Sequence, residues 1–210
     1  MAISRSVPVA TRPVAARALA LARDDSRPEV LEWAAKSLRT AVESAAPNDE
    51  DRVARLCDLA EVLLDRFGRA NNRVDVQEAV TRLQEAVGDP ADPDVIVEPE
   101  PEQSARAHLL LARSLERWYE LDRSLPALGE AARQYREALN LPLPPGRRAL
   151  ALAGRGRVCD IQGRGEEACL AYESCLQAFE ELGLEDYPDA VEARSALARL
   201  RGLSEGQTGH

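Results

Sequence analysis

The sequence predicts an all-α fold, a right-handed α-solenoid of antiparallel helix pairs, and three observations support this prediction. Apolar residues recur at steps of three and four along most of the chain, whereas the alternation typical of strands is nearly absent. Short clusters of Pro, Gly, Asn and Asp separate segments of helix length. One pattern of small and large residues occurs four times, which indicates internal repeats. With 210 residues the chain has room for one continuous stack and no second full domain.

The repeated pattern is a small, a large and a small residue at steps of four and three, which places all three on one helix face. The four triplets are Ala34-Leu38-Ala41, Ala79-Leu83-Ala86, Ala131-Tyr135-Ala138 and Ala168-Tyr172-Cys175. A preceding segment carries a second recurring pair, Val14-Ala15, Leu59-Ala60 and Leu111-Ala112, whose Ala lies 19 residues before the next triplet. In the fourth unit Gly156 lies only 12 residues before Ala168, so we expect about two helical turns to be missing there.

These residues resemble the tetratricopeptide repeat (TPR), whose first helix carries a small residue and whose second helix carries a small, aromatic, small pattern. The best match runs from Gly156 through Gly163, Glu166–Ala168 and Ala171-Tyr172 to Glu180–Gly183. The first three units look like a longer variant, and Leu63–Phe67 with Glu78–Val80 look like actinobacterial arrays often joined to a caspase-like CHAT domain. The usual Trp of the first helix is replaced by Leu56 and His108, and the offsets between triplets, 45, 52 and 37 residues, are uneven. The resemblance implies a stack of about four units with uneven curvature.

The predicted organisation is an N-terminal arm at 1–10, a repeat domain at 11–202 and a C-terminal tail at 203–210. The units are expected at about 11–46, 50–88, 102–141 and 146–183, followed by a capping helix at 189–200. Helix starts carry capping signals at Ser26, Asp75 and Ser124. The basic, Ala-rich segment up to Asp24 is interpreted as a first helix in preference to a transit peptide. The Pro-rich acidic segment from Gly88 to Gln103 is interpreted as a loop between repeats, with a docking strip as the alternative.

Composition bears on the partners. The net charge is −9 and basic residues alternate with acidic ones, so the basic surface that duplex nucleic acid requires is missing. No apolar run reaches the roughly 18 to 20 residues of a membrane span. The four cysteines lack CxxC spacing and lie in helical patterns, where a free Cys behaves as a small apolar residue. We expect a soluble, cytoplasmic protein with no nucleic-acid or membrane partner.

Catalytic signals are weak. His108 and His210 are the only histidines, and position 108 is where the repeat packs a large residue, which favours a core histidine. A dyad of Cys159 and His108 has no support from the pattern. The glycines from Gly154 to Gly165 follow no strand and precede no GK[ST] motif, so they indicate close packing and a turn in place of a phosphate loop. We predict no enzymatic activity, no cofactor and no metal.

Binding is expected on the concave surface that the first helices of a repeat stack line together. Residues near the equivalent positions Ala60, Ala112, Gly156 and Ala198 should face this groove: Glu61, Arg106, Leu109, Arg113, Arg117, Arg157, Ser195 and Arg199. Their guanidinium groups suit carboxylates or backbone carbonyls of a partner segment, although pairing with neighbouring acids on a solvated face is the alternative.

The predicted function is a protein–protein interaction module, an adaptor or scaffold. Alternatives are a regulatory protein that senses a peptide or small molecule, and a helper subunit of a protease or biosynthetic enzyme. Self-association as a homodimer is also considered, because the fourth unit is followed by only one further helix, at 189–200, whose packing face a second copy can cover.

Overall fold

The computed structural model describes residues 11–46, 49, 51–88 and 99–207. Within these residues all regular secondary structure is helical. The helices are α1 (Thr11–Asp24), α2 (Pro28–Ser44), α3 (Arg52–Ala70), α4 (Arg73–Val87), α5 (Pro101–Asp122), α6 (Leu125–Asn140), α7 (Pro145–Ile161), α8 (Gly165–Glu181) and α9 (Pro188–Gln207). The predicted N-terminal arm, most of the Pro-rich segment and the last residues of the tail lie outside the described residues.

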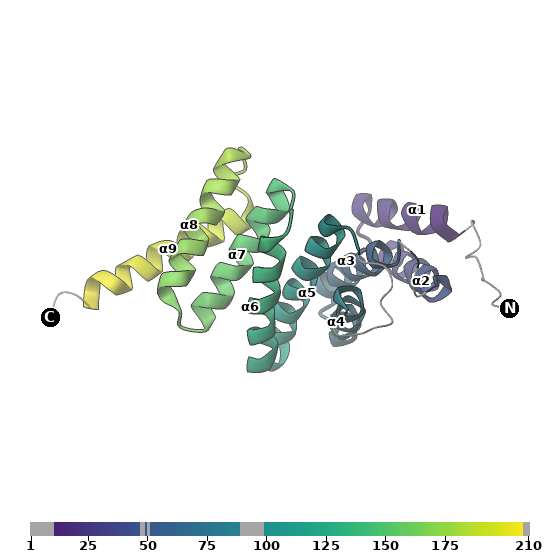
Figure 1. The fold of residues 1–210 in the computed structure, drawn as a ribbon, viewed down its shortest axis with the longest axis horizontal. Helices are drawn as coiled ribbons and strands as arrows, with labels where there is room; N and C mark the ends of the chain where they lie inside the picture. Colours follow the sequence, from purple (N-terminus) through teal and green to yellow (C-terminus); the bar gives the residue numbers. More distant parts are fainter. Residues whose placement is uncertain (1–10, 47–48, 50, 89–98, 208–210) are drawn as a thin grey trace.

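The helices form an elongated stack in chain order, with α1 and α9 at opposite ends of the long axis (Figure 1). Each odd-numbered helix from α1 to α7 packs against the even-numbered helix that follows it, and α9 closes the series. Successive odd-numbered helices also contact one another, whereas successive even-numbered helices in the described chain do not. Because the odd-numbered helices approach one another more closely than the even-numbered ones do, the stack curves with the odd-numbered helices on its inner side. This arrangement confirms the prediction of an α-solenoid of helix pairs.

All twelve residues of the four predicted triplets are buried. The recurring pairs Leu59-Ala60 and Leu111-Ala112 and the small residue Gly156 of the first helices are buried as well. Together they form a continuous core from α1 to α7 and a second cluster shared by α7, α8 and α9. The repeated spacing therefore identified the packing stripe of every unit.

Two glycines of α7 accommodate two tyrosines. A methyl group at Gly154 would lie 2.6 Å from Cε1 of Tyr135 and closer still to its Cζ, and one at Gly156 would lie 2.6 Å from Cδ1 of Tyr172. Gly163 has a φ of 73° in the turn between α7 and α8, a conformation that favours glycine. The interpretation of these glycines as close packing and a turn is confirmed.

The fourth hairpin is shorter, as the spacing predicted. Helices α3 and α5 continue ten residues beyond Ala60 and Ala112, whereas α7 ends five residues beyond Gly156. Helix α8 also begins only three residues before Ala168. At the end of the chain, α9 extends to Gln207, past the expected end of the capping helix at residue 200 and into the expected tail.

The cysteines are free, and three of them are buried: Cys57, Cys159 and Cys175, while Cys169 is half-buried. Burial raises the pKa of the Cys57 and Cys175 thiols from 9.0 to about 12. Burial also raises the pKa of Tyr135 well above 10.0. All three groups are therefore most favourable to the fold when they are protonated.

The free energy of unfolding should consequently fall as pH rises from about 9.0 towards 10.0, because the thiols of the unfolded chain ionise in this interval ahead of most of its tyrosines. In this interval the unfolded chain binds fewer protons than the folded chain, so the free energy of unfolding decreases with rising pH. Urea denaturation at several pH values measures it. The double variant C57A/C175A should flatten the fall. An equal slope in the wild type and the double variant would contradict this assignment.

Candidate partner-binding groove

The eight predicted groove residues lie on the odd-numbered helices α3, α5, α7 and α9. Seven of these residues are at least partly exposed, but the Leu109 side chain is only 3% exposed and belongs to the core. Helix α5 contacts α3, α4, α6 and α7, so its buried surface is wider than one stripe. The expectation that Leu109 faces the groove is therefore wrong, and the other seven side chains are partly or fully exposed.

Glu61 of α3 is the centre of an ion-pair cluster. It binds Arg23 of α1 at 2.9 Å, Arg106 of α5 at 3.0 Å and Arg147 of α7 at 3.6 Å. Arg106 also binds Asp58 at 2.6 Å. Burial alone would raise the pKa of Glu61, but Arg106 and Arg23 hold it below its ordinary value. The cluster joins the four helix pairs along the inner side of the stack.

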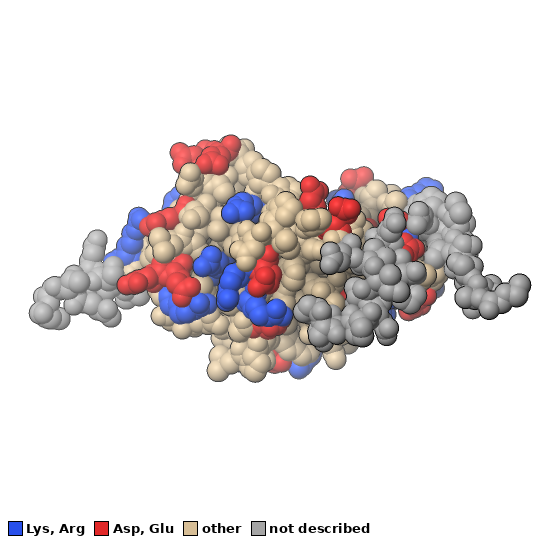
Figure 2. Space-filling model, viewed as in Figure 1, with Lys and Arg blue, Asp and Glu red and all other residues tan. Residues whose placement is uncertain are grey.

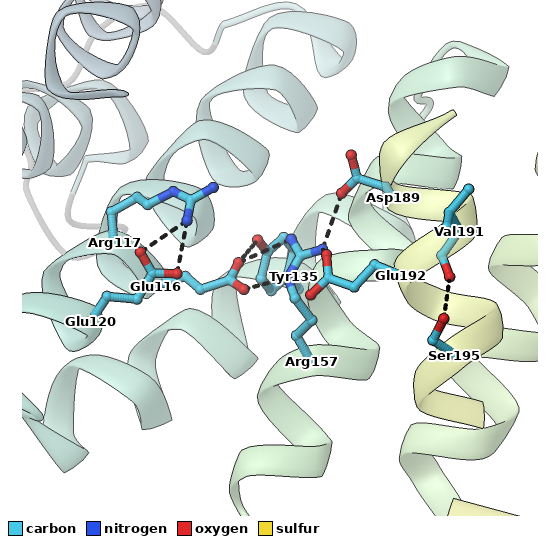
Figure 3. Close-up of polar contacts among 9 residues, drawn as sticks. All are labelled: Glu116, Arg117, Glu120, Tyr135, Arg157, Asp189, Val191, Glu192 and Ser195. Atoms are coloured by element: carbon cyan, nitrogen blue, oxygen red, sulfur yellow. Dashed lines mark hydrogen bonds and ion pairs between the residues drawn. The ribbon is translucent and has the colours of Figure 1, made fainter. Parts of the chain in front are cut away.

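Glu116 of α5 is the centre of a second network, shown in Figure 3. Its side chain is buried and accepts hydrogen bonds from the Tyr135 hydroxyl at 2.6 Å and from Arg157 Nε at 2.6 Å. The same guanidinium donates to Asp189 at 3.0 Å and lies 3.5 Å from Glu192, both on α9. Arg157 thus connects α5, α7 and the last helix.

The electrostatics of this network favour charge on Arg157 and a neutral Tyr135. Burial raises the pKa of the Tyr135 phenol, and the neighbouring Glu116 raises it further. Burial opposes the charge of Arg157, but the carboxylate of Glu116 outweighs it and raises the pKa of the guanidinium. Glu116 was not among the predicted residues, because a Glu between apolar helix positions carries no distinguishing signal in the sequence.

Three other predicted residues have local partners. Arg117 binds Glu120 at 2.7 Å, Arg199 binds Asp160, and the Ser195 hydroxyl donates to the carbonyl of Val191 at 3.0 Å. Figure 2 shows basic side chains beside acidic ones over the middle of the visible face. Four of the five predicted groove arginines are thus paired, as the alternative of a solvated, charge-paired face predicted.

Arg113 is the fifth groove arginine, and it makes no ion pair with any residue that the structure describes. It lines a hollow of about 420 Å³ between α3 and α5 with Asp65, Phe67 and Arg117. A larger hollow of about 560 Å³ adjoins it, because both are lined by Glu120. The larger hollow is formed by α5, α7, α8 and α9.

The larger hollow combines apolar and cationic groups that the sequence pattern did not bring together. Tyr119, Tyr172 and the 49% exposed Ile161 line it beside Arg157, Arg199 and Arg123. Arg123 ends α5 in the left-handed conformation, with a φ of 57°, and its guanidinium lies 5.5 Å from the ring centre of Tyr119. It was missed because it follows the helix, where the helical period no longer applies.

His108 has a structural environment. Its Nδ1 lies 2.5 Å from Oε1 of Gln134, a buried residue of α6, while Cys159 packs in the cluster of α7, α8 and α9. No group of three or more His, Cys, Asp or Glu in the described part of the chain is arranged to hold a metal ion. None of the helices described is both long and apolar enough to cross a membrane.

The fold and the groove define the class of this protein as an α-helical repeat protein. No family model matches the chain, and no curated protein matches its sequence. Among solved structures, the crystal structure of MamA is similar, with 19% sequence identity, a TM-score of 0.50, and coverage of 85% of this chain and 92% of that chain. The de novo designed helical repeat protein DHR64 shares 20% identity with a TM-score of 0.39, covering 94% of this chain and 91% of the design. The likeness to MamA supports the helical repeat fold.

Proposed function

We propose that the chain is a non-catalytic tetratricopeptide-type protein, an adaptor or scaffold whose inner face binds a segment of a partner protein. The observation that carries this proposal is the pair of adjoining hollows on the odd-numbered helices. A groove along first helices is the surface that repeat stacks present to extended ligands. It also contains an exposed apolar side chain, Ile161, which a partner side chain would cover.

The charges of the groove indicate what the segment carries. Arg106, Arg117, Arg157 and Arg199 already have carboxylate partners, so a ligand would have to displace these. Arg113 has no such partner among the described residues, and neither has Arg123, whose guanidinium lies 5.5 Å from the centre of the Tyr119 ring. A carboxylate of the partner bound to either guanidinium displaces no existing ion pair. The groove therefore suits a segment with an acidic residue next to an apolar one.

The test is charge reversal at these two positions. Arg113→Glu with Arg123→Glu should weaken binding of a partner identified with the wild-type chain by tenfold or more, about 1.4 kcal/mol. The matched control is Arg136→Glu, the same charge change at an exposed position of α6, outside the inner face. Isothermal titration calorimetry measures both. Equal affinity of R113E/R123E and the wild type, with both proteins folded by circular dichroism, would refute groove binding. Arg157 is unsuitable because its reversal also breaks the Glu116 network.

A second candidate is a sensor of a peptide or small molecule, favoured by the size and shape of the larger hollow. Its volume of about 560 Å³ lies within the range of small-molecule sites, and α9 supplies one wall through Glu192, Ser195 and Arg199. A thermal-shift screen distinguishes the two candidates, because a ligand that binds only the folded chain raises its melting temperature.

The setting we propose is the cytoplasm of an actinobacterium, where residues 11–202 act as one repeat domain and as a helper of another protein. The tetratricopeptide resemblance of Leu63–Phe67 and Glu78–Val80 supports this setting. A CHAT-type protease or a biosynthetic enzyme encoded beside the gene would identify the partner class. Unrelated neighbours in every genome that carries the gene would remove this support.

A further inference from the structure

The N-terminal end of the stack exposes apolar side chains. Val14, Leu21 and Trp33 are 47%, 40% and 42% exposed and surround a hollow of about 490 Å³ together with Arg17. The repeat pattern makes Val14 equivalent to Leu59 and Leu111, which are buried in the interior units. Helix α1 contacts only α2 and α3 among the described helices. The first pair therefore leaves uncovered a position that the interior pairs bury.

Exposed apolar side chains on an end face indicate that another molecule packs there. The terminal pairs of a repeat array normally present polar outer faces, because nothing packs on them. Here a tryptophan and a leucine lie side by side at the end of the molecule, around one hollow. Burying these side chains would remove apolar surface from water, which favours association. The charged residues around these side chains indicate which molecule binds there.

The apolar side chains of this end face have charged residues of both signs beside them. Arg17 lies on α1 between Val14 and Leu21, and Glu29 lies on α2 one turn before Trp33. Both are exposed, and neither makes an ion pair with a residue that the structure describes. The α2 side also carries the exposed Lys36, so it is not purely acidic. A two-fold axis can still bring Arg17 of one copy to Glu29 of the other.

The opposite end of the stack is a poorer match. It also exposes apolar residues, Leu184, Tyr187 and Val191, but acidic side chains surround them: Glu180, Glu181, Glu185 and Asp186. These acids would meet Glu29 on the α2 side of the N-terminal end. Like charges across an interface disfavour that pairing. A head-to-tail contact would also build open chains, whereas a two-fold contact closes as a dimer.

We propose that the end face formed by Val14, Arg17, Leu21, Glu29 and Trp33 binds the same face of a second copy of this chain. In this dimer α1 of one copy crosses α2 of the other. The apolar side chains of the two copies pack together at the centre, and Arg17 pairs with Glu29 of the second copy at the edges. The grooves of both copies stay open, so the dimer presents two partner-binding sites.

Light scattering after size-exclusion chromatography of the full chain tests the dimer. The mass should be twice that of the chain and should fall on dilution. Trp33→Glu should give a monomer with an unchanged circular dichroism spectrum, and Val191→Glu, the same change at the other end, should leave the dimer intact. A wild-type monomer at the highest concentration reached would overturn the proposal. Species that grow beyond two copies and are lost in V191E would show head-to-tail association instead.

A charge exchange tests the two-fold arrangement separately. Arg17→Glu and Glu29→Arg should each weaken the dimer by up to about 25-fold, because the two-fold dimer contains this ion pair twice and one exposed ion pair contributes up to about fivefold. The double variant R17E/E29R should restore the wild-type dissociation constant, because each reversed charge again meets its opposite on the second copy. A double variant weaker than both single variants would show that the two residues do not meet. R113E/R123E, which alters the groove alone, should dimerise like the wild type.

Discussion

Replacing Arg157 with Met should lower the free energy of unfolding by about 3–5 kcal/mol, the usual cost of removing one partner of a buried ion pair. Arg157 holds Glu116, whose side chain is only 5% exposed, and the methionine cannot replace its hydrogen bonds. The carboxylate would then keep only the hydroxyl of Tyr135 as a partner. Urea denaturation followed by circular dichroism measures the loss.

The structure offers a control one residue from Glu116. Arg117→Met removes the same charge from an ion pair with Glu120 in which both side chains are nearly half exposed, so its cost should be below about 1 kcal/mol. In E116Q/R157M the buried charge is gone as well, so the double variant should recover part of the stability that R157M loses. Equal losses in R157M and R117M would show that burial does not strengthen the network.

The loss should be concentrated at the C-terminal end of the stack. Helix α9 packs through the small side chains Ala190 and Ala193 and through Leu197. Arg157 adds contacts to Asp189 and Glu192, which lie in the first turns of α9. In R157M, hydrogen exchange should become faster in α9 than in α5. Because α9 forms one wall of the larger hollow, ligands of that hollow should bind R157M more weakly.

The sequence predicted the helix pairs well because each depends on burial that repeats locally. The triplets from Ala34 to Cys175 mark the packing stripe without any knowledge of which helices meet. Helix starts were harder to predict. Ser124 caps α6 as expected, but α4 is capped by Asn72, and Asp75 is instead buried beside Arg66. A capping signal is read over three or four residues, and several polar residues can satisfy it.

The groove was predicted less completely, because its electrostatics depend on residues far apart in the chain. The helical period placed Arg106 on the inner face, but its partner Asp58 comes from the preceding unit. Glu116 was missed for the same reason, since Tyr135 and Arg157 approach it from two other helices. Periodicity indicates which way a side chain points, whereas ion pairing requires the distance between helices.

Replacing Gly154 with Ala should lower the free energy of unfolding by about 2–3 kcal/mol, although alanine is the better helix former by about 1 kcal/mol. The added methyl group would overlap the ring of Tyr135. This ring cannot move aside freely, because its hydroxyl donates to the buried Glu116. Gly156→Ala should act in the same direction against Tyr172, but its cost should be smaller, because the Tyr172 hydroxyl makes no such hydrogen bond with a described residue.

Gly129 of α6 provides the matched control for this substitution. It is exposed, and an added methyl group would have no atom within 4 Å, so Gly129→Ala should raise the free energy of unfolding by about 0.5–1 kcal/mol. Opposite signs at Gly129 and Gly154 would show that α7 carries glycine to admit the tyrosine. If both substitutions stabilised the chain, the packing of Tyr135 against α7 would be looser than the structure shows.

Two double variants test the overlap from the side of the tyrosine. In G154A/Y135L a smaller side chain leaves room for the added methyl group, whereas in G154A/Y135W a larger ring increases the overlap. The first should therefore be less destabilised than the second.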